Sequence, residues 1–445
     1  MNTVGSHVTL QRGTTYRGDL VGKPGPALLG LGSIVPGGGF RANHWKTFGG
    51  ECPEKLTLGP RELYVALKGA TKDGSMIGSV ARVPPDIAAG RLTQDTAKLV
   101  FRDRDPEFAT YLYWLLRTPH YRSYCAGRAT GTTAVGFDRA DFLAYPVPPM
   151  TTVSRRLVAL FEAIENKIEL NRQMQLTLES ISLAIFRSWF IEFAPVHEKT
   201  EGTRLRLTQD LADAFPNDFR PSSLGPIPGG WTVATIGEFA SLDRGVSYKG
   251  AFLDDAGTPM INLGCFLGAG RFAVEKIKGY SGACKACHSV RAGDVVVANT
   301  DMTQKRTVLG SPALVPHTEG DELVFSHHVY ALRFASGASH LRPFTYYSLL
   351  SPSFRERAEG FATGTTVLAL PKEAILGYEL VLPPRALLER FNMVAQSLGD
   401  LQTLNRAQSR TLAGIRDVLL PTLVDGSCEG IANDALESLQ KMATQ

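Results

Sequence analysis

The stretch that decides the fold is Ala129-Thr130-Gly131-Thr132-Thr133, because it recurs letter for letter at residues 362–366. The match extends outward in the same order. Upstream, Thr3-Val4-Gly5 returns as Thr235-Ile236-Gly237, at an offset of 232 residues. Downstream, Pro148-Pro149 has its equivalent 235 residues later. Ordered matches over such a length predict a tandem duplication of a whole domain together with the segment that follows it.

Each copy begins with a segment that mixes short apolar runs with Gly and Pro turns. Such runs predict strands, and aromatic-rich helical stretches lie among them. We therefore expect an α+β protein with two mixed α/β domains, at residues 1–150 and 231–383. The expected strands include Leu63–Leu67, Asp294–Ala298 and Val329–Phe334, and the expected helices are Tyr111–Tyr124 and Phe344–Phe354.

Each copy continues into a long helix, at residues 151–196 and 384–425. Apolar residues alternate there at steps of three and four, which predicts a coiled-coil seam. Asn171 and Asn405 take equivalent seam positions, and a buried seam Asn fixes register. We expect the two helices to pair with one another; the alternative is that each packs only on its own domain. The expected seam residues are Leu157, Leu160, Ile164, Asn171, Leu178, Ile181, Phe391, Val394, Leu398, Asn405, Leu412 and Ile415.

The remaining segments are a Pro- and charge-rich linker, residues 197–230, and a tail, residues 426–445. We expect the linker to form a short helical turn around Leu207–Phe215 and to run over the surface.

Composition narrows the class of protein only slightly. The formal net charge of +4 permits a nucleic-acid partner without requiring one. The N-terminus lacks the layout of a signal peptide, and no apolar run approaches the roughly 18 residues of a membrane span. Six scattered cysteines do not form a disulfide framework. We therefore expect a cytoplasmic protein with no membrane partner.

The ordered set of motifs resembles the specificity subunits of type I restriction–modification systems. Four features carry the resemblance: the segment Leu224–Glu238, the repeated Thr-Gly-Thr-Thr, the segment Ile185–Phe193 at the end of the first long helix, and the order domain, helix, domain, helix. The first copy departs from the pattern, because it starts almost at Thr3 and lacks the Gly-Trp that precedes Thr235.

The resemblance implies two target recognition domains on an antiparallel coiled coil with pseudo-twofold symmetry. Each domain would read one half of a bipartite site in double-stranded DNA, and the helices would fix the spacer and dock two adenine methyltransferase subunits. Two motor–nuclease subunits can join such an assembly. The chain itself would be non-catalytic, with S-adenosylmethionine and ATP held by its partners. The alternatives are a self-sufficient or degenerate DNA methyltransferase and a structural adaptor of a phage-defence complex.

Three groups of residues are candidates for contacting DNA. Two loops differ between the copies although their flanking strands match, and Asn, Gln and Arg there can read bases. The Thr/Gly loops can offer amides to phosphate, and the shared cation–aromatic sets suit phosphate or sugar. Ordinary solvated loops, domain-closing turns and plain surface positions are the respective alternatives. The candidates are Lys68, Thr71, Lys72, Asn299, Thr300, Thr303, Gln304, Lys305 and Arg306 in the divergent loops; Thr130, Gly131, Thr132, Thr363, Gly364 and Thr365 in the Thr/Gly loops; Arg12, Tyr16, Arg17, Arg244, Tyr248 and Lys249 in the shared sets; and His327 and His328.

Other motifs point to no chemistry. Cys284-Lys285-Ala286-Cys287-His288 matches the c-type haem pattern, but no export signal precedes it and no fourth zinc ligand lies at finger-like spacing. Gly30-Leu31-Gly32 lacks the spacing of a dinucleotide loop and predicts a turn. Neither a P-loop nor an amino-methyltransferase tetrapeptide occurs. We expect no catalytic residue, metal or cofactor in this chain.

Overall fold

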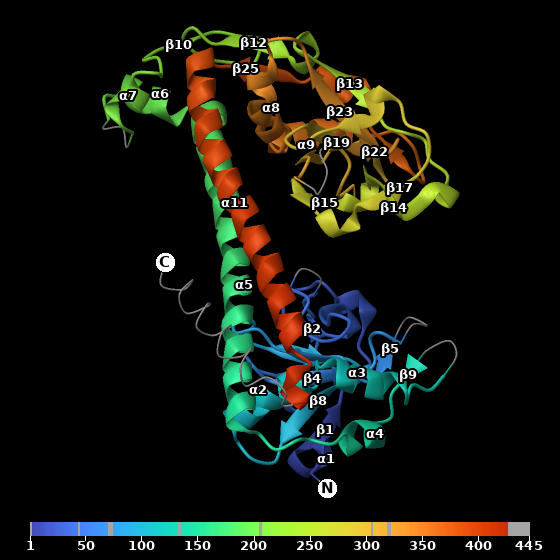
Figure 1. Ribbon diagram of the computed structural model, residues 1–445. Coiled ribbons are helices and arrows are strands. Elements are labelled where there is room, and N and C mark those ends of the chain that lie inside the picture. The colour runs from blue at the N-terminus through green and yellow to red at the C-terminus, as the bar shows by residue number, and fades with distance from the viewer. Residues whose placement is uncertain are drawn as a thin grey trace. The chain divides into compact units, whose positions relative to one another are not determined.

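The computed structural model describes residues 2–42, 45–69, 74–131, 135–203, 207–303, 306–317 and 322–425 (Figure 1). The expected tail, residues 426–445, lies outside the described residues. The chain divides into two compact units, Met1–Gln173 with Asn405–Gln445, and Met174–Leu404. Each unit therefore holds one mixed domain together with part of each long helix.

The strands of the first domain are β1 (Val8–Arg12), β2 (Ala27–Leu29), β3 (Thr57–Leu58), β4 (Leu63–Ala66), β5 (Lys68–Gly69), β6 (Val80–Arg82), β7 (Gly90–Leu92), β8 (Thr96–Phe101) and β9 (Val135–Gly136). An antiparallel sheet has the order β1-β8-β4-β6. A second sheet has the order β2-β7-β3, with β2 parallel and β3 antiparallel to β7. The strands β5 and β9 form a separate antiparallel pair.

The strands of the second unit are β10 (Phe219–Arg220), β11 (Ile227–Pro228), β12 (Thr232–Thr235), β13 (Ala240–Arg244), β14 (Leu253–Ile261), β15 (Phe266–Gly268), β16 (Arg271–Phe272), β17 (Lys278–Tyr280), β18 (Ser289–Val290), β19 (Val295–Ala298), β20 (Thr300–Asp301), β21 (Pro312–Leu314), β22 (Leu323–Phe325), β23 (Val329–Phe334), β24 (Leu368–Ala369) and β25 (Glu379–Leu382). The sheet β13-β23-β19-β21 repeats the order of the first domain's main sheet. In the sheet β17-β14-β22-β18, β14 is again parallel and β18 antiparallel to β22. The duplication predicted from the sequence is therefore also a duplication of topology.

Helices cover these sheets at equivalent points of each copy. They are α1 (Val4–His7), α2 (Pro106–Leu115), α3 (Pro119–Ala126) and α4 (Arg139–Ala144) in the first domain, and α8 (Arg342–Leu349), α9 (Pro352–Gly360) and α10 (Lys372–Leu376) in the second. Each aromatic-rich stretch that we expected as one helix is two helices. The side chains of Thr118 and Ser351 cap new helix N-termini, and a Pro follows each cap at the first helical position.

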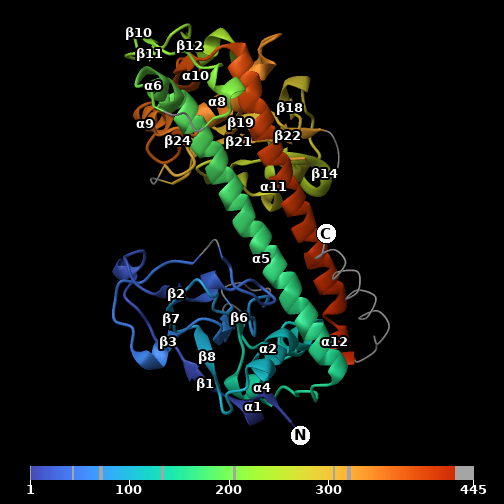
Figure 2. The ribbon, with the colours of Figure 1, turned by 90° about the vertical axis from the view of Figure 1, so that its left-hand side faces the viewer.

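The two long helices are α5 (Thr152–Phe186) and α11 (Arg385–Leu419), each of 35 residues and therefore about 53 Å long (Figures 1 and 2). A π-helical turn, Arg187–Ile191, continues α5, and α12 (Thr422–Asp425) follows α11. The start of α5 packs on the end of α11 in the first unit, and the end of α5 packs on the start of α11 in the second. The helices therefore run antiparallel.

In the first unit the helices share the core of the first domain. Leu157, Leu160 and Ile164 of α5 are buried in one cluster with Leu412 and Leu419 of α11. The first domain is also bound to α5 by charge. Arg82 pairs with Glu162 at 2.9 Å, Trp114 Nε1 donates to the same carboxylate at 2.7 Å, and Arg117 pairs with Glu165 at 3.3 Å. These contacts hold the first domain on the helix pair from the inside of the unit.

A polar layer lies between the helices at the seam asparagines. Asn171 is fully buried, and its Nδ2 donates to Gln408 Oε1 at 2.8 Å, to Ser409 Oγ at 3.2 Å and to the backbone carbonyl of Asn405 at 3.4 Å. Such a layer is satisfied in one register only, so it specifies the pairing of the two helices.

In the second unit an aromatic cluster takes the place of the ion pairs. Phe391 of α11 lies 5.7 Å from Phe186 and 5.2 Å from Phe190, measured between ring centroids. Phe344 of α8 and Trp231 join the same core. Apolar area therefore provides most of the contact between this domain and the helices.

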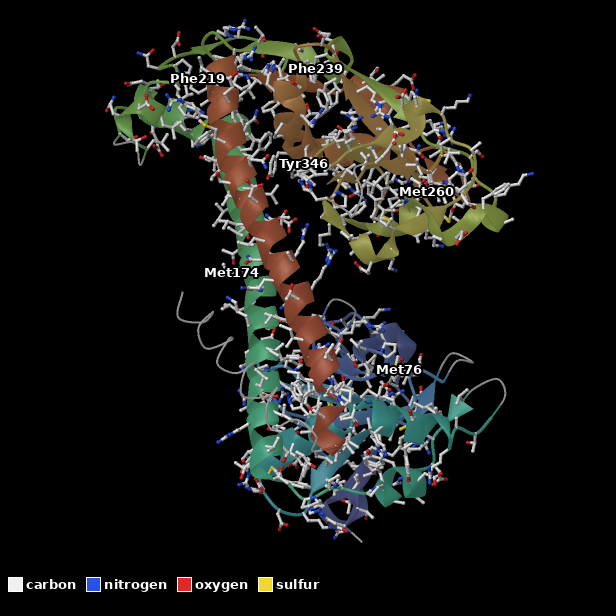
Figure 3. The ribbon with its side chains drawn as sticks, viewed as in Figure 1. Met76, Met174, Phe219, Phe239, Met260 and Tyr346 are labelled. Carbon is white, nitrogen blue, oxygen red and sulfur yellow. The ribbon has the colours of Figure 1, made fainter. Side chains whose placement is uncertain are left out.

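The middle of the predicted seam is less buried than its ends. Leu178, Val394, Leu398 and Ile415 are half-buried. Ile181 is 41% exposed whereas the adjacent Ser182 is buried, so the prediction of Ile181 as a seam residue is wrong. A straight helix of 3.6 residues per turn drifts away from a strict heptad, and this drift brings the next residue to the contact face. Met174, labelled on α5 in Figure 3, is 40% exposed.

The linker contributes to the second core. It contains the end of α6 (Ala194–Thr200), α7 (Gln209–Ala212) and the β10–β11 pair. Phe215 and Ile227 are buried, and the Phe215 ring lies 5.5 Å from that of Trp189 at the end of α5. The expectation of a surface segment is therefore wrong for these residues, because their apolar side chains close one end of the core.

Candidate nucleic-acid interface

The structure joins two loops that the sequence presented separately. In the second domain, β20 at the start of the divergent loop pairs with β24 at the end of the Thr/Gly loop, with Thr300 opposite Ala369. In the first domain, β5 pairs with β9 in the same way, with Lys68 opposite Gly136. Each domain therefore presents the two candidate loops side by side.

The Thr/Gly loops are hairpins of the same geometry. Thr130 and Gly136 exchange two backbone hydrogen bonds of 3.0 and 2.7 Å, and Thr363 and Ala369 exchange bonds of 3.0 and 2.8 Å. Gly131 and Gly364 have φ angles of +99° and +100°, a conformation that favours glycine. The Thr130 and Thr363 hydroxyls donate to the closing carbonyls, so they stabilise the hairpin. Thr365 is exposed, and Thr132 lies outside the described residues.

The divergent loop of the second domain is held by a buried carboxylate. Asp301, 1% exposed, accepts from the backbone N–H and hydroxyl of Thr303, both at 2.7 Å, and from the N–H of Val308 at 2.9 Å. Arg306 is half-buried, and its Nη1 donates to the carbonyl of Glu359 at the end of α9. Gln304 and Lys305 lie outside the described residues.

Asn299 is also a supporting residue in this structure. Its side chain is buried, and its Nδ2 donates to the carbonyl of His327 at 3.1 Å. Its own N–H donates to the carbonyl of His328, and its carbonyl accepts from Leu370. An amide held in this way fixes the adjacent backbone and is not presented to a base.

The corresponding loop of the first domain begins at Lys68, which is half-exposed and lies 3.8 Å from the Asp95 carboxylate. Thr71 and Lys72 lie outside the described residues. Arg122 anchors the far end of this loop by donating to the carbonyls of Ile77 and Ser75, both at 2.7 Å.

Arg355 occupies the equivalent position in the second domain and donates to the carbonyls of Leu309 and Arg306. Sequence reasoning used Arg122 and Arg355 only as markers of the repeat. Their conserved spacing between the copies was the available signal for this anchoring role.

The cation–aromatic sets differ in their surroundings. Arg12 and Arg244 are exposed, and each donates through Nε to a turn carbonyl. Arg17 is paired with Asp19 at 2.8 Å, and this hydrogen bond lowers the pKa of the Asp19 carboxyl. Arg17 is therefore already engaged by an acid.

The two aromatic members also differ. The Tyr16 ring packs edge-on to Phe48 at 6.0 Å, whereas the Tyr248 ring lies 6.0 Å from that of His327. Lys249 is exposed.

His327 and His328 lie next to one another at the start of β23, with ring centroids 3.9 Å apart. Thr300 Oγ1 lies 2.9 Å from His328 Nδ1. Burial lowers the pKa of both imidazoles, and Arg244 lowers each further. Both rings are therefore neutral near pH 7 in the free protein, and a neutral imidazole offers one donor and one acceptor.

No metal centre emerges from the residues that the structure describes. Cys284 and Cys287 are exposed thiols beside the 3₁₀ turn Ala286–His288, and His288 Nδ1 accepts from the backbone of Lys285. Within the described ranges, His, Cys, Asp and Glu side chains form no group of three or more that could hold a metal ion. The described helices include none with the length and hydropathy needed to cross a membrane.

Fold and site together define a class of protein: a duplicated pair of mixed domains on two antiparallel helices, each domain presenting the same paired loops. Among known proteins, the chain is 21% identical over 354 residues to the type I restriction enzyme MjaIX specificity subunit of Methanocaldococcus jannaschii, covering 76% of this chain and 74% of that one. It is 24% identical over 377 residues to the HindI specificity subunit of Haemophilus influenzae, covering 72% and 77%. No protein-family model matches the chain.

A solved structure shares the fold. The S subunit of a type I restriction–modification system from M. genitalium superposes with a TM-score of 0.50 over 95% of both chains, at 14% identity. The resemblance to type I specificity subunits that the sequence indicated is therefore confirmed.

Proposed function

We propose that this chain is the DNA-reading subunit of a type I restriction–modification assembly, with each domain reading one half of a bipartite site. The observation that carries the proposal is the repeated loop pair. The β5–β9 and β20–β24 pairs occupy the same place in both copies, and each brings a constant Thr/Gly hairpin against a variable loop. Constant backbone groups suit phosphates, and variable side chains suit bases.

The long helices would set the unread spacer and dock two adenine methyltransferase subunits. The exposed surface of α11 supports a docking role. Met393 and Leu404 are each 64% exposed and Leu401 is 46% exposed. At about 100° per residue the three lie within an arc of about 80° on one side of the helix. A stripe of large apolar side chains left open to water is typical of a surface that a partner covers.

Catalysis would then belong to the partners. In this arrangement S-adenosylmethionine is bound by the methyltransferase subunits and ATP by the motor–nuclease subunits, where these are present. This chain would supply the position on DNA at which the methyl group is transferred.

The test is co-expression of the full chain with its genomic neighbour methyltransferase, followed by genome-wide mapping of methylated adenine. The proposal predicts a split motif with a fixed gap. A stable complex that leaves DNA unmethylated and binds it without sequence preference would favour the structural adaptor. Binding of S-adenosylmethionine by the isolated chain would favour a degenerate methyltransferase.

A further inference from the structure

Both domains place a tight turn beside the paired loops. In the first domain the turn Thr93–Thr96 joins β7 to β8 and is closed by a backbone hydrogen bond of 3.1 Å from Thr96 to Thr93. In the second domain the turn Ser326–Val329 joins β22 to β23 and is closed by the equivalent bond of 2.9 Å. The central residues are Gln94-Asp95 and His327-His328.

An arginine fixes the first central residue of each turn. Arg12 Nε donates to the carbonyl of Gln94 at 3.3 Å, and Arg244 Nε donates to the carbonyl of His327 at 3.0 Å. The contact is to the backbone, so it is the same whatever side chain the turn carries. It also places an exposed cation beside each turn.

A backbone bond fixes the second central residue. The N–H of Leu67 donates to the carbonyl of Asp95, and the N–H of Asn299 donates to the carbonyl of His328, both at 3.0 Å. Leu67 and Asn299 directly precede β5 and β20, so each turn is joined to the strand that carries the divergent loop.

A glycine completes each frame. A Cβ atom on Gly13 would lie 2.1 Å from the carbonyl oxygen of Thr93, and one on Gly245 would lie 2.1 Å from that of Phe325. Both contacts are shorter than any side chain tolerates, so the close approach of the turn to the strand before it requires glycine in both copies.

The side chains at the tips differ completely although the backbone is the same. Gln94 is exposed and Asp95 half-buried, and the latter lies beside Lys68. In the second domain both tip residues are half-buried imidazoles, and Thr300 replaces the lysine. The same pair of positions therefore makes an ion pair in one domain and a hydroxyl–imidazole contact in the other.

We propose that the tips Gln94-Asp95 and His327-His328 are the specificity-determining positions of the first and second domain. This inference rests on the proposed function. In a chain that reads two different half-sites, groups that touch phosphate can be shared, whereas groups that touch base edges must differ. The arginines and Thr/Gly hairpins are shared, and the tips differ on an unchanged backbone.

The chemistry of each tip indicates what it reads. The Gln94 amide matches the N6 and N7 edge of adenine, and the Asp95 carboxylate can accept from N4 of cytosine. Thr300 binds Nδ1 of His328, so the Nε2 atom of that ring is the one a base would meet. The two half-sites should therefore differ at the base pairs that face the tips.

The experiment exchanges the tips in the full chain, co-expressed with the methyltransferase. The double variant Gln94→His and Asp95→His should change the methylated motif in one half only, with the other half and the gap unchanged. The reciprocal variant His327→Gln and His328→Asp should change the other half only. The matched control is Asp103→His with Arg104→His, an exposed pair beyond the other end of β8, and it should leave both halves unchanged.

Retention of the wild-type motif by both tip variants would overturn the inference, while a wild-type split motif would leave the proposed function standing. If a tip variant methylates nothing, DNA is selected from a random pool by the same assembly. Recovery of only the untouched half supports the assignment, and recovery of the full wild-type motif contradicts it. Absence of a split motif in the wild type would instead contradict the proposed function.

Discussion

Single side chains divide into those that hold the paired loops and those that the loops present. Asn299 and Asp301 belong to the first kind, because both are buried with their polar atoms bonded to backbone. Sequence reasoning placed Asn299 among the reading residues because an amide in a variable loop suits a base. It missed Gln94 because a turn between two short strands contains no run of cations or amides. Only the pairing of distant strands brings that turn beside the divergent loop.

Arg12 and Arg244 should act through phosphate. We predict that Arg12→Gln or Arg244→Gln lowers the affinity of the assembly for its site by about tenfold and reduces the salt slope by about one, with the motif unchanged. Fluorescence anisotropy at several salt concentrations measures both quantities. Arg17→Gln is the control, because Arg17 is already paired with Asp19, and it should have a smaller effect. A change in the recognised sequence would contradict the assignment to phosphate.

His327 and His328 should make the stability of the second unit depend on pH. Burial lowers the pKa of both rings in the folded chain, so the unfolded chain binds more protons as the pH falls through about 6.5. The free energy of unfolding should therefore decrease below that pH and level off under the lowered values. Thermal unfolding between pH 7.5 and pH 5 should show a smaller decrease for His327→Gln with His328→Gln than for the wild type. An identical decrease would contradict this origin.

At the scale of elements, the periodicity of the sequence predicted both long helices within a few residues and failed at Ile181. The failure has a geometric cause, since the seam of a straight helix drifts by one position over a few turns. The single expected helix at each aromatic stretch failed for a local reason, the Thr-Pro and Ser-Pro caps. These dipeptides were visible in the sequence.

The helix pair of the second unit should depend on its aromatic cluster. Phe391→Ala removes a ring that is 1% exposed and contacts Phe186 and Phe190, so we predict a loss of about 3–5 kcal/mol in the free energy of unfolding. Met393→Ala on the same helix, at a residue 64% exposed, should cost less than about 0.5 kcal/mol. Urea unfolding compares the two. Equal losses would show that the cluster does not hold the helices together.

The length of α5 and α11 should set the spacer. Four residues inserted into each helix, after Met174 and after Leu404, add about 6 Å to each and nearly one turn, so the contact faces are roughly preserved. We predict a gap longer by about one to two base pairs, with both half-sites unchanged. The mapped methylation motif gives this number directly. A gap of the wild-type length would contradict the role of the helices as a ruler.

At the scale of the whole molecule, the duplication was readable because the two copies share a residue order at a nearly constant offset. The sequence could not reveal that each copy brings the same two loops and the same turn together, since β5–β9 and β20–β24 pair over more than 60 residues. It also misjudged the linker, because the apolar residues that enter the core are few and scattered among charges. Repeated topology with divergent tips is what connects the fold to the reading of two unequal half-sites.

The central claim is that one chain reads a bipartite DNA site with one half assigned to each domain. The most direct measurement replaces residues 1–150 with the corresponding domain of a related specificity subunit and maps methylated adenine after co-expression with the methyltransferase. The account predicts a hybrid motif in which one half changes, while the other half stays as in the wild type. A change in both halves, or in neither, would contradict the account.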